Sequence, residues 1–236
     1  MESFMSKIKY ILFDCMETVI DIIENPDIRL YAWWAYNGSG YEYLWENFGS
    51  FSSHYSTVKA QIENKKNQLE EYNTFERFNL MAKNKITDVI KAKEAVNAIS
   101  NNYWKNYKAN CYVDSKVKST LSHVCSKFKC GIVSNFMVPR GIEELLKDFG
   151  IYDHFDFVIS SIDVGWRKPH KKIFDKVIEI SGGSVEQMLF VGDNYICDYV
   201  GPLNYGFDAI LLDKVNIHSK ANKRINRLED LLTYIE

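Results

Sequence analysis

The sequence predicts an α/β fold, in which a parallel sheet carries helices on both faces and a separate helical unit interrupts the chain. The first observation is a short apolar run, Tyr10 to Phe13, bounded by polar residues. Such a run suits a strand buried on both faces. The second is that short apolar runs alternate with helical segments from Cys111 onward, which is typical of a parallel sheet. The third is that the residues between these two parts show helical spacing and no strand alternation.

Residues 22–108 are expected to form an all-helical unit. Asn25-Pro26 offers a cap and a first-turn proline for one helix, which Asn37-Gly38 ends. Apolar residues from Val58 to Tyr72 predict a long amphipathic helix, and Thr87 is the expected N-cap of another. The unit is rich in aromatic residues, which at this spacing are more often core than ligand contacts: Trp33, Trp34, Tyr41, Tyr43 and Trp45.

The remainder of the chain supplies the other strands and their helices in turn. Strands are expected at 130–134, 157–160, 188–191 and 209–212, and helices at 117–128, 139–149, 171–180, 199–205 and 228–235. Since the first strand has to join this later sheet, the helical unit is an insertion. The expected domains are therefore 1–21 with 109–236, and 22–108. An insertion at this point suits a lid over a binding site.

Composition and charge exclude several classes of protein. The formal net charge is −2 and the basic residues are scattered, so there is no electrostatic basis for binding nucleic acid or an anionic membrane. No signal-like segment and no apolar run of membrane-spanning length is present. The five cysteines form no CxxC pair and no zinc spacing, which indicates reduced thiols. We expect a cytoplasmic protein, monomeric or homodimeric, that binds neither nucleic acid nor membrane.

Four polar signals follow predicted strands or precede helices. Because parallel strands end at one edge of a sheet, where open α/β sheets bind ligands, these signals are expected to lie close together. They are Asp14, Ser134-Asn135, Lys168 within Gly165–Pro169, and Gly192-Asp193-Asn194 followed by Asp198.

Each signal alone has an ordinary structural explanation. A strand-end aspartate can cap a helix, a serine can occupy a turn, and a lysine can be a solvated surface cation. Together they form a chemical set. Asp14 and Asp193 suit a hard cation such as Mg²⁺. Ser134 and Lys168 suit the spread negative charge of a transferring phosphoryl group. A carboxylate can also attack phosphorus when a cation and a lysine offset the charge repulsion.

These signals, in this order, resemble the motifs of the haloacid dehalogenase superfamily. The fourth motif is the most specific, since VGDNYICDYVGP, from Val191, looks like a form found in a phosphatase-like branch. GWRKPHKKIF, from Gly165, is similar to the family's GxxKPDPxIF, with His170 and Lys171 as departures. The resemblance implies a Rossmann-like, doubly wound parallel core with an inserted all-helical cap of the C1 type, as in subfamily I.

The resemblance also implies a role for each matching residue. Asp14 would be the nucleophile of a hydrolase. Ser134 and Lys168 would be catalytic, and both would bind the phosphoryl group together with Asn135. The substrate would be a small phosphorylated metabolite.

A Mg²⁺ cofactor is implied by the same motifs. Its ligands would be the carboxylates of Asp14 and Asp193 and the backbone carbonyl of Met16. Asp198 and Thr18 would stand behind these ligands and orient the bound waters.

Met16 departs from the family pattern. The usual phosphatases have a second aspartate there, which acts as general acid and base, and a thioether cannot transfer a proton near neutral pH. One reading is a phosphatase that protonates its leaving group through Glu17, another residue or water, or that acts on a good leaving group. A second is a dehalogenase, because a halide leaves unprotonated. A third is a degenerate member that binds a phosphorylated ligand without turnover.

Asp193 helps to separate these readings. Dehalogenases of this superfamily need no Mg²⁺ and generally lack that aspartate, whereas this chain has both Asp193 and Asp198. The sequence therefore predicts a Mg²⁺-dependent phosphomonoesterase that works through an aspartyl-phosphate. The alternatives are a catalytically atypical member of the superfamily and, less favoured, a 2-haloacid dehalogenase.

Overall fold

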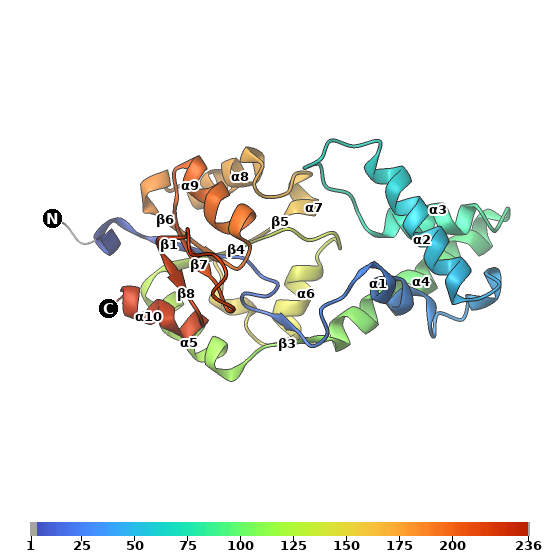
Figure 1. The fold of residues 1–236 in the computed structure, drawn as a ribbon, viewed down its shortest axis with the longest axis horizontal. Coiled ribbons are helices and arrows are strands. Elements are labelled where there is room, and N and C mark those ends of the chain that lie inside the picture. The colour runs from blue at the N-terminus through green and yellow to red at the C-terminus, as the bar shows by residue number, and fades with distance from the viewer. Residues whose placement is uncertain (1–3, 236) are drawn as a thin grey trace. The chain divides into compact units, whose positions relative to one another are not determined.

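The computed structural model describes residues 4–235, and the chain divides into two compact units. One unit consists of Met1–Asp21 with Tyr112–Glu236, and the other of Ile22–Cys111. The chain passes between them through two short strands, β2 (Asp21–Ile22) and β3 (Cys111–Tyr112), which pair with each other. Figure 1 shows the elements in chain order.

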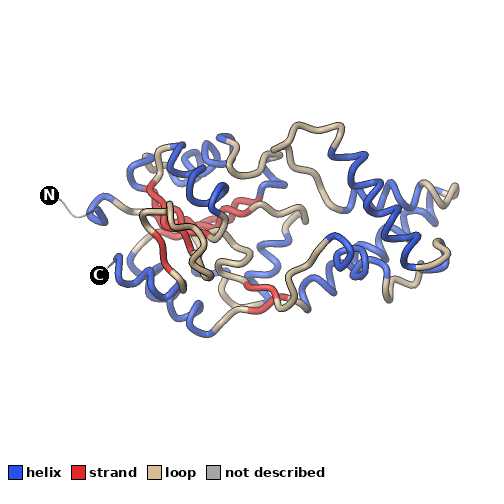
Figure 2. Tube along the Cα trace, in the orientation of Figure 1, coloured by secondary structure: helices blue, strands red, loops and turns tan. Residues whose placement is uncertain are grey.

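The larger unit is built on a six-stranded sheet in the order β5-β4-β1-β6-β7-β8. Every neighbouring pair in it is parallel (Figure 2, strands in red). This confirms the predicted α/β class. The strands are β1 (Tyr10–Phe13), β4 (Lys129–Ser134), β5 (Phe157–Ser160), β6 (Met188–Gly192), β7 (Asp208–Leu212) and β8 (Arg224–Ile225).

Helices cover this sheet, as expected for parallel strands. Alternate residues of β1, Tyr10 and Leu12, pack in one apolar cluster with α8 residues such as Phe174, while Ile11 and Phe13 between them are also fully buried. Both faces of the sheet are therefore covered. The α-helices of this unit are α5 (Ser115–Lys127), α6 (Gly141–Asp148), α7 (Ser161–Val164), α8 (Lys171–Ser181), α9 (Gly201–Tyr205) and α10 (Leu232–Ile235).

The smaller unit is helical and has an aromatic core. Phe51, Tyr55, Phe78 and Tyr103 are buried and contact one another in sequence, with ring centroids 5.6 to 6.3 Å apart. Of the other aromatics, Trp34 and Trp45 are buried, whereas Trp33 and Tyr43 are exposed. Its helices are α1 (Ile28–Tyr36), α2 (Phe48–Glu63), α3 (Phe75–Lys83) and α4 (Val89–Ala109). Among residues 4–235, no helix is long and apolar enough to cross a membrane.

Three helix boundaries in this unit differ from the prediction. Asp27, rather than Asn25, caps α1, and its Oδ1 accepts a hydrogen bond from the Leu30 N–H at 2.8 Å. Asp88, rather than Thr87, caps α4. The helix expected over 58–72 instead begins at Phe48 and ends at Glu63. Two capping residues lie close together at each of these helix starts, Asn25 and Asp27 at α1 and Thr87 and Asp88 at α4. Apolar spacing alone did not show the loop after Glu63.

The last third of the chain holds two features that the pattern did not predict. A π-helix, Tyr195–Val200, precedes α9, so the helix expected from Tyr199 begins four residues earlier. The short strand β8 extends the sheet beyond β7. Two residues are too few to show a period of two, which is why β8 was missed.

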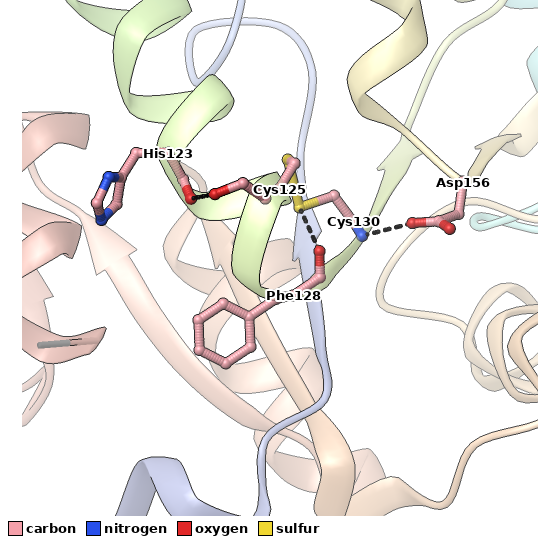
Figure 3. Close-up of a disulfide and its surroundings, with 6 residues drawn as sticks. His123, Cys125, Phe128, Cys130 and Asp156 are labelled. Atoms are coloured by element: carbon pink, nitrogen blue, oxygen red, sulfur yellow. Dashed lines mark hydrogen bonds between the residues drawn. A yellow bond between two sulfur atoms is a disulfide. The ribbon is translucent and has the colours of Figure 1, made fainter.

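The cysteines differ from the expectation of reduced thiols. Cys125, in the last turn of α5, and Cys130, in β4, form a disulfide (Figure 3), with their Cα atoms 5.6 Å apart. The Cys130 N–H also donates to Asp156 Oδ2 at 2.9 Å. Because α5 ends just before β4 begins, the two cysteines, five positions apart in sequence, come within bonding range. A spacing of five residues does not by itself predict this geometry.

A thiol count tests this disulfide. Protein purified without reductant and then denatured should contain three thiols that react with Ellman's reagent, those of Cys15, Cys111 and Cys197. After reduction and removal of the reductant, all five should react. Five reactive thiols in the unreduced protein would contradict the disulfide.

Candidate functional site

The four strand-end signals meet around one cavity of about 160 Å³ in the larger unit. Seven residues singled out in the sequence line it, namely Asp14, Met16, Ser134, Asn135, Lys168, Asp193 and Asp198. Thr18 does not line it, but its hydroxyl donates to Asp193 Oδ1 at 3.4 Å. Asn194, which the sequence analysis named but gave no role, and Cys197, which it did not name, also line the cavity. Both lie inside the run from Gly192 to Asp198, so the motif itself could have pointed to them.

Asp14 is held at the cavity by the middle of the sheet. The preceding residue, Phe13, pairs with Ile132 of β4 on one side and Val191 of β6 on the other. The Asp14 N–H continues this pattern by donating to the Val191 carbonyl at 2.9 Å. Its carboxylate is therefore fixed by two parallel neighbours, and the residue is only 7% exposed.

Lys168 is buried against Asp14 and is not a surface cation. Its residue is 1% exposed, and its Nζ donates to Asp14 Oδ1 at 2.6 Å and to the Val133 carbonyl at 2.7 Å. The third contact is with Asp198 Oδ1 at 2.7 Å. The ammonium therefore makes two hydrogen bonds and one further ion pair, all with protein atoms. Burial acts to lower the pKa of Lys168, but the Asp14 and Asp198 carboxylates outweigh it and raise the pKa, so the lysine is charged.

Glycine makes room for the third carboxylate. A Cβ on Gly192 would lie 2.6 Å from the Cβ and Cγ of Asp198, closer than real side-chain atoms approach. Asp198 Oδ2 in turn accepts from the Asn194 N–H at 3.0 Å. The Gly-Asp-Asn turn and the π-helix after it therefore place Asp198 behind Lys168.

The three aspartates carry more negative charge than one lysine offsets. Asp14, Asp193 and Asp198 each place a carboxylate oxygen within 4.8 Å of the others. Burial, and then the negative charges of Asp14 and Asp198, raise the pKa of Asp193 to about 7. The pKa of Asp198 is also raised, chiefly by burial. A divalent cation would relieve this repulsion, and carboxylate oxygens are the donors that Mg²⁺ prefers. The residues therefore fit a magnesium ion.

The raised pKa of Asp193 predicts that Asp193→Asn stabilises the metal-free protein. The ordinary pKa is 3.8 and the folded-state value is about 7, so the unfolded chain loses its proton first as pH rises, and stability falls between these values. Asparagine removes this penalty. At pH 8 the free energy of unfolding should rise by about 1 to 3 kcal/mol, less than the full shift implies because the carboxyl is partly solvated.

Urea unfolding in a chelating buffer measures this effect. The gain should be largest at pH 8 and small at pH 4, where the folded-state carboxyl is protonated and the unfolded one is only partly ionised. Asp153→Asn, at an exposed position in the same unit, should show no such pH-dependent gain. An Asp193→Asn protein that is no more stable than the wild type at pH 8 would contradict the electrostatic account.

Ser134 is the last residue of β4, the strand that pairs with β1 on the side opposite β6. It lines the cavity and is 1% exposed. The loop that follows is tied to the next strand, because the Phe136 N–H donates to Ser161 Oγ at 2.9 Å and Ser160 Oγ donates to the Phe136 carbonyl at 3.2 Å. These two hydrogen bonds hold the loop directly after Ser134 in place.

Met16 faces the cavity, whereas Glu17 is not among its lining residues. Glu17 has a left-handed backbone, with φ of 59°, and its N–H donates to the Ile20 carbonyl at 2.7 Å. Met16 pairs with Ile20 in the same turn. In the part of the chain that the structure describes, the carboxylates lining the cavity are those of Asp14, Asp193 and Asp198.

Cys197 contributes a protonated thiol to the cavity wall. Burial, and then the Asp198 carboxylate, raise the pKa of this thiol. A protonated thiol is a weak donor and a poor nucleophile. Its Sγ donates to the Lys168 carbonyl at 3.4 Å.

The comparison that decides the family is a sequence match over most of the chain. The model of the haloacid dehalogenase-like hydrolases matches residues 8–202, which include all four motifs. The chain belongs to this family. The resemblance seen in the sequence is therefore confirmed.

Individual relatives of this family member match a smaller part of the chain. The human haloacid dehalogenase-like hydrolase domain-containing protein 3 is 32% identical over 122 residues, which are 50% of this chain and 48% of that protein. The glyceraldehyde 3-phosphate phosphatase of Methanothermobacter thermautotrophicus is 34% identical over 96 residues, 40% of this chain and 42% of that protein. The chain spans about half the length, or less, of the curated relatives it matches.

A solved structure matches nearly the whole fold. The 2-haloacid dehalogenase from Pseudomonas syringae superposes with a TM-score of 0.78 and covers 97% of this chain and 98% of its own. Its sequence is only 15% identical, so this likeness shows the fold alone.

Proposed function

We propose that this family member is a Mg²⁺-dependent phosphomonoesterase that hydrolyses a small phosphorylated metabolite, with Asp14 as nucleophile. The observation that carries the proposal is the buried cluster in which Lys168 contacts Asp14 and Asp198 while Asp193 stands beside them. One lysine cannot offset three carboxylates, which suits a divalent cation, and that cation would in turn attract a phosphoryl group.

The metal ligands in this proposal are the carboxylates of Asp14 and Asp193 and the backbone carbonyl of Met16. Asp198 and Thr18 stand behind them and orient ligands and bound water. When bound, Mg²⁺ supplies positive charge that offsets the charge of the phosphoryl oxygens.

Asp14 forms a bond to phosphorus while the bond from phosphorus to the leaving oxygen breaks. Lys168 offsets negative charge during this step, and the Ser134 hydroxyl donates to a phosphoryl oxygen. The resulting aspartyl-phosphate is then hydrolysed by water, which releases inorganic phosphate and restores the carboxylate. Met16 has no proton to give, so in this proposal the leaving oxygen takes its proton from water or from a residue outside the cavity lining.

Two comparisons favour phosphate chemistry over dehalogenation. The carboxylates Asp193 and Asp198, which dehalogenation does not need, are retained at the cavity. A relative that matches the chain at 34% identity is named as a phosphatase. Met16 favours a second candidate within the same chemistry, a member that binds a phosphorylated ligand and turns over only esters with good leaving groups.

Selection of the substrate belongs to the helical unit in this proposal. Ile22–Cys111 is inserted between the strand that carries Asp14 and the rest of the sheet, which is the place of a cap in this family. We infer that this unit is the cap and that its side chains choose the leaving group.

Phosphate release from a panel of esters tests the proposal. The panel should span activated aryl esters and alkyl esters, with and without Mg²⁺, and include a 2-haloacid with a halide readout. We expect Mg²⁺-dependent phosphate release, fastest from aryl esters, and no halide release. Halide release without Mg²⁺ would replace the proposal by dehalogenation. Phosphate binding without release from any ester would replace it by ligand binding.

A further inference from the structure

The side chain of Asn135 is committed to the backbone of Lys168. Its Oδ1 accepts from the Lys168 N–H at 2.6 Å, and its Nδ2 donates to the Lys168 carbonyl at 3.1 Å. One carboxamide therefore bonds both the backbone N–H and the backbone carbonyl of Lys168, which lies 33 positions later in the chain. The second Nδ2 hydrogen bond goes to Cys197 Sγ at 3.8 Å.

The side-chain amide of Asn135 has no N–H left for a phosphoryl group. An asparagine side chain has two N–H bonds, and both are directed at protein atoms. Its remaining acceptor capacity lies on Oδ1, which would repel a phosphoryl oxygen. If Asn135 binds substrate, as the sequence suggested, it does so through its backbone N–H and not through its side-chain amide.

The Lys168 peptide is held from two further directions. The Cys197 thiol donates to the Lys168 carbonyl at 3.4 Å, so that carbonyl accepts two hydrogen bonds. Behind the next residue, a Cβ on Gly201 would lie 2.6 Å from the Pro169 Cβ, so α9 starts in close contact with this loop. Such close packing requires glycine there.

These contacts with the Lys168 backbone matter because the ammonium group of the same residue lies at the centre of the site. Its Nζ must reach Asp14 Oδ1, Asp198 Oδ1 and the Val133 carbonyl at once, at 2.6 to 2.7 Å. Three simultaneous contacts fix the ammonium only if the backbone from which the side chain extends is also fixed. A shift of about 1 Å in such a group can lower the rate on the order of 100-fold.

We propose that Asn135 and Cys197 are positioning residues, which clamp the Lys168 peptide so that its ammonium stays between Asp14 and Asp198. For catalysis, this inference rests on the proposed phosphatase function. For the clamp itself it does not, because the state of the ammonium can be measured without turnover.

The kinetic test separates positioning from substrate binding. Asn135→Ala should lower kcat about 10- to 100-fold and change KM less than threefold, and Cys197→Ala should lower kcat two- to fivefold. Asn204→Ala, at an exposed position of α9, is the matched control and should change neither constant. A rise in KM at unchanged kcat for Asn135→Ala would instead show direct substrate binding and overturn the proposal.

The spectroscopic test uses the NH₃⁺ resonance of Lys168 in ¹⁵N-labelled protein, assigned by its loss in Lys168→Met. In the wild type this buried ammonium should exchange its hydrogens slowly with water. Exchange should be at least tenfold faster in Asn135→Ala and several-fold faster in Cys197→Ala, which serves if Asn135→Ala does not fold. Unchanged exchange in a folded variant would overturn the clamp. If the wild type hydrolyses no ester, faster exchange still supports the clamp while the proposed function fails.

Discussion

Replacing Asp14 by asparagine is expected to lower kcat for phosphate release by at least about 10³-fold. The amide keeps the shape of the side chain, and its oxygen can still accept from Lys168, so the fold should be preserved. What is lost is the negative charge and nucleophilicity of the carboxylate that would attack phosphorus. Initial rates on an aryl phosphate with saturating Mg²⁺ measure the effect.

Two controls make the Asp14→Asn result specific. Asp153→Asn, an exposed aspartate of the same unit, should keep wild-type turnover. Rapid quenching of the wild type during turnover should trap phosphate on the protein in an alkali-labile form, and Asp14→Asn should trap none. A variant that retains more than about a tenth of wild-type kcat would place the nucleophile elsewhere.

Replacing Met16 by aspartate is expected to raise kcat/KM for alkyl phosphates about 10²- to 10⁴-fold, the usual worth of a positioned general acid. Met16 lines the cavity two residues after Asp14, so a carboxyl there faces the reacting group. Aryl esters leave without a proton and should gain little. The ratio of the two rates, alkyl to aryl, is therefore the quantity to measure.

Met16→Leu is the matched control for this gain. It removes the thioether, adds no acid and keeps an apolar side chain of similar volume, so both rates should stay near wild type. Equal gains on alkyl and aryl esters from Met16→Asp would point to tighter metal or substrate binding instead of leaving-group protonation. No gain on alkyl esters would show that proton transfer is not what limits this protein.

The sequence was sufficient to predict the sheet and the cavity because both depend on local, repeated signals. Tyr10 to Phe13 is apolar on both faces, and parallel strands that end at one edge must bring Asp14, Ser134 and Asp193 together. Lys168 was harder, since one lysine before a helix is ordinarily solvated. Its burial follows from two carboxylates and a carbonyl that lie on three different segments of the chain.

The features that were missed depend on tertiary contacts or on competition between neighbours. The hydrogen bonds of Asn135 and Cys197 go to backbone groups of Lys168. Every residue has these backbone groups, so the sequence does not indicate which of them a side chain will contact. At the start of α1 both Asn25 and Asp27 are residue types that cap helices, and the structure has Asp27 in that position. The disulfide of Cys125 joins the end of a helix to the strand after it, which spacing alone does not encode.

The strand at the middle of the sheet, β1, pairs only with strands that lie far along the chain. Tyr10 pairs with Lys129 on one side and Met188 on the other, so β1 has no partner until most of the chain has left the ribosome. Ile22–Cys111, in contrast, forms its own compact set of contacts and can fold meanwhile. Contacts this distant in sequence slow folding. During synthesis the apolar β1 segment therefore stays unpaired at least until β4 has been made.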